Sequence, residues 1–349
     1  MTAPLPSPPN AVQIAIRRIA FGDSLDAELA TEAFGSVMRG EATAAQIAAL
    51  LVGLRVKGET AAEVTGAARA LRGAMLRLPV AESELLVDTC GTGGGAVPTF
   101  NISTAAALLA AGAGVRIAKH GNRSFTTQSG SADVLEQLGV TLEAPVELAA
   151  RALDEAGITF MFAPAMHPAM RHVGPVRREL GIPTVMNIVG PLANPAGAGR
   201  QVVGVAERGR MALLSGALAS LGAAHALVVH GEPGMDEISP MGLTHVAEVR
   251  DGSVREWTID PGDYGFRGFA PTDLKGGSPA ENARTIIDVL SGRGSAAATA
   301  AVVLNAAGAL YVAPGSRSFA DCVRTAADAL ANGSGTAALE RMRKAYSHR

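Results

Sequence analysis

The chain has 349 residues, of which 48% are hydrophobic, 4% aromatic and 18% charged, and its formal net charge at pH 7 is −2. This length allows a large core in two domains or in one large α/β unit, and the composition excludes a disordered or fibrous chain. The slightly acidic balance argues against broad nucleic-acid binding. No apolar run reaches the roughly 18 residues of a membrane span, and the opening MTAPLPSPPN lacks a secretory signal pattern. We therefore expect a cytoplasmic protein without a membrane partner, with a flexible arm over 1–10.

The first part of the chain has the apolar spacing of helices. Apolar residues recur at helical intervals in four segments, which are 11–20, 26–38, 43–56 and 60–75. The last of these opens with Thr60-Ala-Ala-Glu63, which has the form of a capping box. Each helix has an apolar face to bury, so this region needs a partner surface.

From Leu85 onward, short apolar runs alternate with helical stretches. The runs are LLVDTC at 85–90, VRIAKHG at 115–121, ITFMFAP at 158–164, QVVGV at 201–205 and ALVVHG at 226–231. This alternation predicts a parallel or mixed sheet flanked by helices. Asp251-Gly252 joins 244–250 to 253–259 in a predicted hairpin, and helical patterns return over about 279–345.

The change of pattern near 80–85 predicts two domains. We expect a small all-helical domain over 11–84, which helices from about 166–195 join. The rest of the chain, 85–349, is expected to form a larger α/β domain with a central, mostly parallel sheet.

A glycine-rich loop follows the first predicted strand. The stretch DTCGTGGGAVPTFNIST, from Asp88 to Thr104, leads into a helix that begins near Ser103. Free backbone amides and a helix N-terminus at the carboxyl end of a strand favour phosphate binding. The loop matches neither GxxxxGK[ST] nor GxGxxG. On the loop alone, a glycine-rich turn that binds no ligand is an equally good interpretation.

Two later stretches place charged residues beside predicted strands. KHGNRS, from Lys119 to Ser124, follows an apolar run at the end where α/β sheets hold ligands, although a pair such as Lys119 and Arg123 is more often a solvated surface. GMDEISP, from Gly234 to Pro240, sets two carboxylates in a turn. Oxygen ligands of this kind suit Mg²⁺, although a lone Asp-Glu pair is more often plain surface.

In this order, these stretches resemble the anthranilate phosphoribosyltransferase family. The resemblance covers most of the chain, including MRGEATAAQIAALLVGLRVKGET at 38–60 and the stretches NIST, KHGNRS, SGSADVLEQLG, RRELG, GPLANP and DEIS. It implies the fold of nucleoside phosphorylases and class 3-like phosphoribosyltransferases, with the helical domain packed on the α/β domain. It implies the transfer of the phosphoribosyl group of phosphoribosyl pyrophosphate to the anthranilate amine, with release of pyrophosphate, in tryptophan biosynthesis. It also implies Mg²⁺ as cofactor and a homodimer, for which the apolar faces of 11–20 and 43–56 offer a surface.

The same resemblance implies three groups of site residues. Those for phosphoribosyl pyrophosphate are Gly91, Thr92, Gly94, Gly95, Thr99, Asn101, Ile102, Ser103, Thr104, Lys119, Asn122, Arg123, Ser124, Thr126, Thr127 and Ser131. Those for anthranilate are Gly91, Asn122 and Arg177, with His120 and His167 along its route. Those for Mg²⁺ are Ser103, Asp236 and Glu237. Gly95 departs from the family's GTGGD pattern, so the role of that aspartate is not carried over.

The implied reaction is a displacement at the ribose C1 carbon by the anthranilate amine. An aryl amine is neutral at pH 7, so attack requires no strong general base. We expect catalysis through positioning of the substrates and stabilisation of the departing pyrophosphate. No covalent intermediate is expected, because no nucleophile is paired with a base, and Cys90 and Cys322 are predicted to be buried thiols.

Two other interpretations come from different classes of protein. A pyrimidine nucleoside phosphorylase would share the helical and α/β domains, but that family resembles KHSTGG where this chain has CGTGG. A nucleic-acid-binding member of the wider superfamily would need a basic surface, which a net charge of −2 does not indicate.

Overall fold

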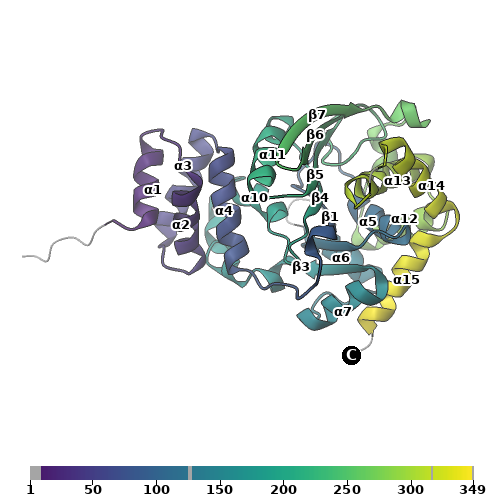
Figure 1. The fold of residues 1–349 in the computed structure, drawn as a ribbon, viewed down its shortest axis with the longest axis horizontal. Coiled ribbons are helices and arrows are strands. Elements are labelled where there is room, and N and C mark those ends of the chain that lie inside the picture. The colour runs from purple at the N-terminus through teal and green to yellow at the C-terminus, as the bar shows by residue number, and fades with distance from the viewer. Residues whose placement is uncertain (1–8, 125–127, 316, 348–349) are drawn as a thin grey trace, which may run out of the picture. The chain divides into compact units, whose positions relative to one another are not determined.

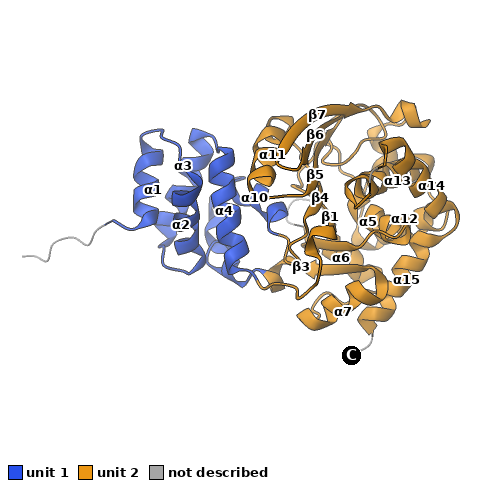
Figure 2. Cartoon of the chain, in the orientation of Figure 1, with its two compact units in different colours: residues 1–75, 167–193 blue, residues 76–166, 194–349 orange. Residues whose placement is uncertain are grey.

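The computed structural model describes residues 9–124, 128–315 and 317–347. It contains two compact units, which Figure 2 colours separately: unit 1 is Met1–Met75 with His167–Ala193, and unit 2 is Leu76–Met166 with Asn194–Arg349. Thr126 and Thr127 of the predicted site, and most of the predicted arm over 1–10, lie outside the described residues.

Unit 1 is helical. Its elements are α1 (Ala11–Ala20), α2 (Ala27–Met38), α3 (Ala44–Lys57), α4 (Ala61–Ala74), η2 (Pro168–Arg171), α9 (Gly174–Leu180), α10 (Met186–Val189) and η3 (Gly190–Leu192). The capping box predicted at Thr60 is present, since Thr60 and Glu63 each accept a hydrogen bond from the other's backbone amide. The buried Glu63 carboxylate also accepts from the amide of Leu25 at 2.9 Å and pairs with Lys57 at 3.1 Å. One carboxylate therefore joins the start of α4 to the segment before α2 and to the end of α3.

Unit 2 contains a seven-stranded sheet with the order β3-β2-β1-β4-β5-β6-β7. The strands are β1 (Val87–Gly91), β2 (Ile117–Gly121), β3 (Ile158–Phe162), β4 (Arg200–Gly204), β5 (His225–Gly231), β6 (Thr244–Arg250) and β7 (Ser253–Ile259). The first five are parallel, whereas β6 and β7 are antiparallel, which confirms the mostly parallel sheet. The hairpin at Asp251-Gly252 is also confirmed. Both residues have positive φ, 49° and 78°, as a type I′ turn requires.

Helices cover both faces of this sheet (Figure 1). They are α5 (Ile102–Gly112), α6 (Ser131–Gln137), α7 (Val146–Ala156), α8 (Ala163–Met166), α11 (Met211–Ser220), α12 (Pro279–Leu290), α13 (Ala296–Val312), α14 (Phe319–Ala331) and α15 (Ser334–Ser347), with short turns η1 (Ser83–Leu85), η4 (Arg208–Arg210), η5 (Pro261–Tyr264) and η6 (Pro271–Leu274). Helices α5 and α13 pack on the central strands β1 and β4, whereas α11 packs on β5, β6 and β7 from the other side. In the part of the chain that the structure describes, no helix combines the length and apolarity needed to cross a membrane.

The core of unit 2 follows the alternation of side chains along the strands. In β2, Ile117 belongs to the large cluster beneath α5 and α13, whereas its neighbour Ala118 belongs to a second cluster on the opposite face. That second cluster contains Leu153 of α7. Strands buried on both faces appear in a sequence as continuous apolar runs, which is why the five runs were visible there.

All five predicted apolar runs differ from the observed strands by one or two residues at their ends, and two of the differences have a clear cause. The strand predicted over 85–90 begins at Val87, because Ser83–Leu85 forms η1. The strand predicted over 158–164 ends at Phe162, because α8 follows directly. In both cases apolar residues continue beyond the residues that pair with a neighbouring strand. The apolar pattern alone therefore predicts strands that are too long at these ends.

Candidate active site

A glycine loop connects β1 to α5 where the strand order reverses between β1 and β4, the position at which open α/β sheets bind ligands. Gly93 and Gly94 have φ of 69° and 80°, in the region that favours glycine. Thr92 anchors the loop to β4, since its amide donates to the Gly204 carbonyl at 2.9 Å. Within the described residues, the amides of Gly94 and Gly95 donate no hydrogen bond. The loop therefore presents unused donors at the carboxyl end of the sheet.

The Asp236-Glu237 turn lies across this loop. The amide of Gly93 donates to Oδ2 of Asp236 at 2.9 Å, and the amide of Ser103 donates to Oε1 of Glu237 at 3.1 Å. A Cβ atom at Gly91 would lie 2.7 Å from Oδ2 of Asp236. One at Gly204 would overlap the carbonyl oxygen of Asp236. Glycines at the ends of β1 and β4 thus make room for the turn.

The first residues of α5 differ in what they can offer a ligand: Ile102 only its backbone, Ser103 and Thr104 also a hydroxyl. Ile102 is fully buried, so only its backbone is available to a ligand. The hydroxyl of Ser103 lies 3.4 Å from Nζ of Lys119, next to Glu237. Thr104 is buried, and its hydroxyl has no hydrogen-bond partner among the described residues. The helix start therefore provides a polar atom that its own protein does not satisfy.

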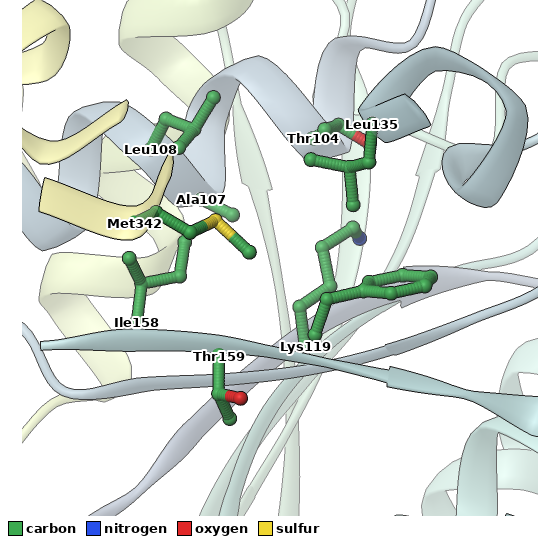
Figure 3. Close-up of a pocket in the computed structure, with 9 residues that line it drawn as sticks. Thr104, Ala107, Leu108, Lys119, Leu135, Ile158, Thr159 and Met342 are labelled. Atoms are coloured by element: carbon green, nitrogen blue, oxygen red, sulfur yellow. The ribbon is translucent and has the colours of Figure 1, made fainter. Parts of the chain in front are cut away.

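Lys119 lies beneath the helix start. Figure 3 shows its side chain extending from β2 toward Thr104 at the beginning of α5. The residue is 3% exposed, and its ammonium donates to the carbonyl oxygen of Thr89. In this conformation the ammonium contacts protein groups, so a direct contact with phosphate stays a prediction.

Burial raises the pKa of three carboxyl groups in this region, two of which, Asp88 and Glu237, also interact with the Lys119 charge. It does so for Asp88 and for Asp236, and the Lys119 ammonium offsets part of the effect at Asp88. Burial, followed by the charge of Asp236, also raises the pKa of Glu237 well above its usual value. A cation bound beside these groups would favour their ionised forms.

The donor set fits Mg²⁺. The Ser103 hydroxyl and the carboxylates of Asp236 and Glu237 are oxygen ligands. Each carboxylate accepts a hydrogen bond from a backbone amide through one oxygen, which leaves its other oxygen for a metal. No cluster of three or more His, Cys, Asp or Glu side chains suited to a metal occurs within residues 9–124, 128–315 and 317–347. Two carboxylates are nevertheless sufficient, because Mg²⁺ usually completes its shell with water and substrate phosphate.

The loop after β2 is held by α6. Asp133 accepts hydrogen bonds from the amides of Ser124 at 3.1 Å and Gly130 at 2.9 Å. The guanidinium of Arg123 pairs with Asp133 at 2.9 Å and with Glu136 at 2.6 Å. Arg123 is thus held by carboxylates here, and its predicted contact with phosphate stays a prediction.

Other predicted residues of this loop and of the segment before α5 also have backbone roles. The carbonyl of Asn122 accepts from the hydroxyl of Ser131 at 3.4 Å. His120 is buried, and its amide donates to Oδ1 of Asp88 at 3.1 Å. Thr99 forms an isolated antiparallel bridge with Lys275. These contacts fix the backbone from which the predicted side chains project.

Two of the five residues predicted for anthranilate, Arg177 and His167, belong to unit 1. Arg177 on α9 donates to Oδ1 of Asn187 at 3.4 Å, and no carboxylate of the described residues forms an ion pair with it. Burial lowers the pKa of Arg177, and it lowers that of His167 to about 4. Arg178 is exposed by comparison. A half-buried guanidinium without an anionic partner is a suitable group for a carboxylate ligand.

Three buried asparagines also support unit 2, and of these only Asn194 lies in one of the stretches that carry the family resemblance, GPLANP. Asn305 in α13 bonds the amide and the carbonyl of Ile238, both at 2.9 Å, directly after the carboxylate pair. Asn194 donates to Oδ2 of Asp88 at 2.8 Å. Asn282 in α12 is the third. The sequence around Asn282 and Asn305 contains no motif that would identify their partners.

Two family models match the chain. The model described as glycosyl transferase family, a/b domain, matches residues 83–336. The model described as glycosyl transferase family, helical bundle domain, matches residues 13–75. Together they span most of the sequence.

Named relatives and solved structures agree with these models. The anthranilate phosphoribosyltransferase of Rubrobacter xylanophilus is 51% identical over 327 residues, which cover 94% of this chain and 95% of the relative. The crystal structure of anthranilate phosphoribosyltransferase from Thermus thermophilus superposes with a TM-score of 0.90 at 42% identity, covering 95% of this chain and 99% of that one. The Saccharomyces cerevisiae enzyme in complex with PRPP and Mg has a TM-score of 0.87 at 25% identity, covering 97% and 98%.

Proposed function

The chain belongs to the anthranilate phosphoribosyltransferase family, and we propose that it holds phosphoribosyl pyrophosphate and Mg²⁺ at the site around Ser103, Asp236 and Glu237. It is a glycosyltransferase that transfers the phosphoribosyl group of phosphoribosyl pyrophosphate to the amine of anthranilate, in tryptophan biosynthesis. The observation that carries the site proposal is the pair of hydrogen bonds that Asp236 and Glu237 accept from Gly93 and Ser103. They bring oxygen ligands for a metal to a phosphate-binding loop.

The pyrophosphate part of the substrate is proposed to lie against the glycine loop and the start of α5. The unused amides of Gly94 and Gly95, and the unsatisfied hydroxyl of Thr104, are donors without competing partners in the described residues. Phosphate oxygens at a helix N-terminus are favoured by the helix dipole as well as by these donors. This arrangement stabilises negative charge that increases on the leaving group during the reaction.

The metal is proposed to bind between the Ser103 hydroxyl and the two carboxylates. When bound, Mg²⁺ supplies positive charge that stabilises the departing pyrophosphate. The carboxylates orient it, and the amides of Gly93 and Ser103 fix the carboxylates in turn. The Saccharomyces cerevisiae relative with PRPP and Mg supports this use of the metal.

Chemistry at the ribose requires little acid-base help from the protein. The C1–N bond to anthranilate forms, the C1–O bond to pyrophosphate breaks, and the anthranilate nitrogen loses one proton. Because the amine lone pair is available at neutral pH, the contribution of this chain is orientation of both substrates. The high pKa that burial gives the Cys90 thiol leaves it unsuited to act as a nucleophile.

Arg177 is proposed to bind the carboxylate of anthranilate. It is half-buried and carries no ion pair with a described carboxylate, so its charge is available to a ligand. Its guanidinium fork matches the two oxygens of a carboxylate. Gly91, Asn122, His120 and His167 are proposed to lie along the route of the same substrate.

We also propose a cytoplasmic homodimer. Phe21, after α1, is 87% exposed and Val56, near the end of α3, is 81% exposed. They follow or end two helices that pack against each other, α1 and α3, and contiguous exposed apolar surface of this kind is a candidate contact surface. Both cysteines are free thiols, as is usual in the reducing cytoplasm.

A fluorescence assay tests the function and the site together. Purified chain is mixed with anthranilate, phosphoribosyl pyrophosphate and Mg²⁺, and loss of anthranilate fluorescence is followed. We expect a loss that requires all three additions and that slows strongly in Glu237→Gln. Steady fluorescence with the wild type would refute the function, whereas equal rates for wild type and Glu237→Gln would refute only the metal site.

A further inference from the structure

The side chain of Asn101, directly before α5, connects three segments of unit 2. Its Oδ1 accepts hydrogen bonds from Nδ2 of Asn282 and from the hydroxyl of Ser129, both at 3.0 Å. Its own Nδ2 donates to the carbonyl of Ser129 at 3.1 Å. The start of α5 is therefore bonded to the turn before α6 and to the first part of α12.

Asn282 has a second partner in the turn before α12. Its Oδ1 accepts from the amide of Gly277 at 2.8 Å. The same turn lies against the segment that leads into α5, since the amide of Gly276 donates to the carbonyl of Pro98 at 3.1 Å. A Cβ atom at Gly276 would overlap the carbonyl of Thr99, so this close approach requires glycine.

An amide is the side chain that these partners require. Asn282 is 3% exposed, and it must accept from one backbone amide while donating to a side-chain oxygen. Alanine would leave both partners without this bond, and aspartate would place a carboxylate against Oδ1 of Asn101. Buried polar groups that lose a partner cost more than an ordinary surface hydrogen bond contributes.

From these contacts we propose that Asn282 is a positioning residue for phosphoribosyl pyrophosphate, acting through Asn101 on the start of α5. This inference rests on the proposed function of the site. Asn101 immediately precedes the residues that carry the Ser103 and Thr104 hydroxyls. Fixing Asn101 therefore fixes the direction in which the helix start presents its donors, and small errors in such positions weaken binding of a ligand.

The test compares wild type with Asn282→Ala and Asn282→Asp. The KM for each substrate, kcat and Tm are measured at saturating Mg²⁺, and binding of phosphoribosyl pyrophosphate is measured by calorimetry. We expect both variants to raise the KM for phosphoribosyl pyrophosphate roughly tenfold, while the KM for anthranilate changes less than about twofold. The aspartate variant retains the acceptor for Gly277, so its effect comes from the contact with Asn101, where a donor is replaced by a carboxylate.

Ile286→Val is the matched control. Ile286 lies one turn further along α12 and is fully buried, but it takes no part in these hydrogen bonds. Its loss of a methyl group should lower Tm without changing either KM, because it removes only packing. If Asn282→Ala does not fold, Ser129→Ala removes the other hydrogen bond to Oδ1 of Asn101, with the same expected effect on KM.

The outcomes separate the inference from the function on which it rests. A wild-type protein that does not consume anthranilate refutes the function, and the calorimetric affinity for phosphoribosyl pyrophosphate then still decides the role of Asn282. An active wild type with folded Asn282 variants of unchanged KM and affinity refutes the inference. So does an equal rise in both KM values, or a rise of the same size in Ile286→Val.

Discussion

The backbone amide of Gly93 donates a hydrogen bond of 2.9 Å to Oδ2 of Asp236, a residue 143 positions later in the chain. The glycine loop and one proposed metal ligand are therefore parts of one arrangement. A change in the charge or position of this carboxylate is expected to alter the loop. By linkage, metal and phosphate-bearing substrate should then strengthen each other's binding.

Changing Asp236 and Glu237 together to Ala should raise the Mg²⁺ concentration needed for half-maximal rate at least tenfold and slow turnover. The double change removes both carboxylates, whereas Asp236→Asn alone keeps an acceptor for Gly93 and should have a smaller effect. Initial rates across a Mg²⁺ titration measure this, with circular dichroism to verify the fold. An unchanged titration curve for the double variant would remove both residues from the metal site.

Gly95→Asp should strengthen the interaction with Mg²⁺ without abolishing activity. A Cβ atom at Gly95 would lie 3.1 Å from Oδ1 of Asp236, so the new carboxylate would join the existing one after a small adjustment. We expect stronger inhibition at millimolar Mg²⁺. Gly95→Asn is the uncharged control, and superimposable rate-versus-Mg²⁺ curves for the two variants would exclude a metal role for this position.

Arg177→Ala should raise the KM for anthranilate much more than that for phosphoribosyl pyrophosphate. It removes a charge-assisted contact worth roughly 1.5–3 kcal/mol, which corresponds to about a tenfold to hundredfold change. The exposed neighbour provides the control, since Arg178→Ala should leave both KM values near wild type. Similar anthranilate kinetics in the two variants would contradict the assignment of Arg177.

His167 should make the protein less stable as the pH falls below neutrality. Burial lowers its folded pKa to about 4, whereas the unfolded value is about 6.5, so the unfolded chain binds the proton first. The contribution is complete above about pH 6.5 and is lost progressively toward pH 4, with about 2 kcal/mol lost between pH 7 and pH 5. Urea unfolding at both pH values should show a smaller decrease in His167→Gln. Equal decreases would contradict a buried, neutral imidazole.

Phe21→Glu and Val56→Glu should each weaken the proposed dimer. Glutamate at either position removes apolar surface from the contact and would have to lose its water to be buried there. The variants should therefore shift toward monomer mass at micromolar concentration. Size-exclusion chromatography with light scattering measures this. Ile287→Glu, at a position 37% exposed on α12 in unit 2, is the control and should match wild type. A wild type of monomer mass would already contradict the dimer.

The sheet was predictable because its parallel strands are buried on both faces. The run VRIAKHG contains β2, and the turn Asp251-Gly252 marks the hairpin of β6 and β7 by its chemistry. The position of β4 beside β1 has no local signal. It depends on which helices cover which face, and that choice is made by packing of residues far apart in the sequence.

Residues of the candidate site could be predicted only where a sequence motif contains them. The helix start near Ser103 and the Asp-Glu pair were singled out from their residues, and the resemblance added their expected roles. Neither signal shows that Asn282 and Asn305 fix the backbone beside them. Arg123 illustrates the opposite case, since this cation of a stretch predicted to bind ligand pairs with the carboxylates of Asp133 and Glu136. The partners of such groups are set by the three-dimensional path of the loop, which spacing does not encode.

The order of the site residues along the chain bears on how the protein is made. During synthesis the glycine loop emerges early, but Asp236 follows much later, and Asn282 and Asn305 come from the helices near the C-terminal end. A nascent chain that has not yet reached α13 has no complete place for the substrate, so the ligand cannot stabilise its early folding by mass action. The central strand β1 also pairs with β4, which is made about a hundred residues later, and such distant pairings form slowly. Ligand should therefore stabilise the full-length chain against unfolding but not chains truncated before α13.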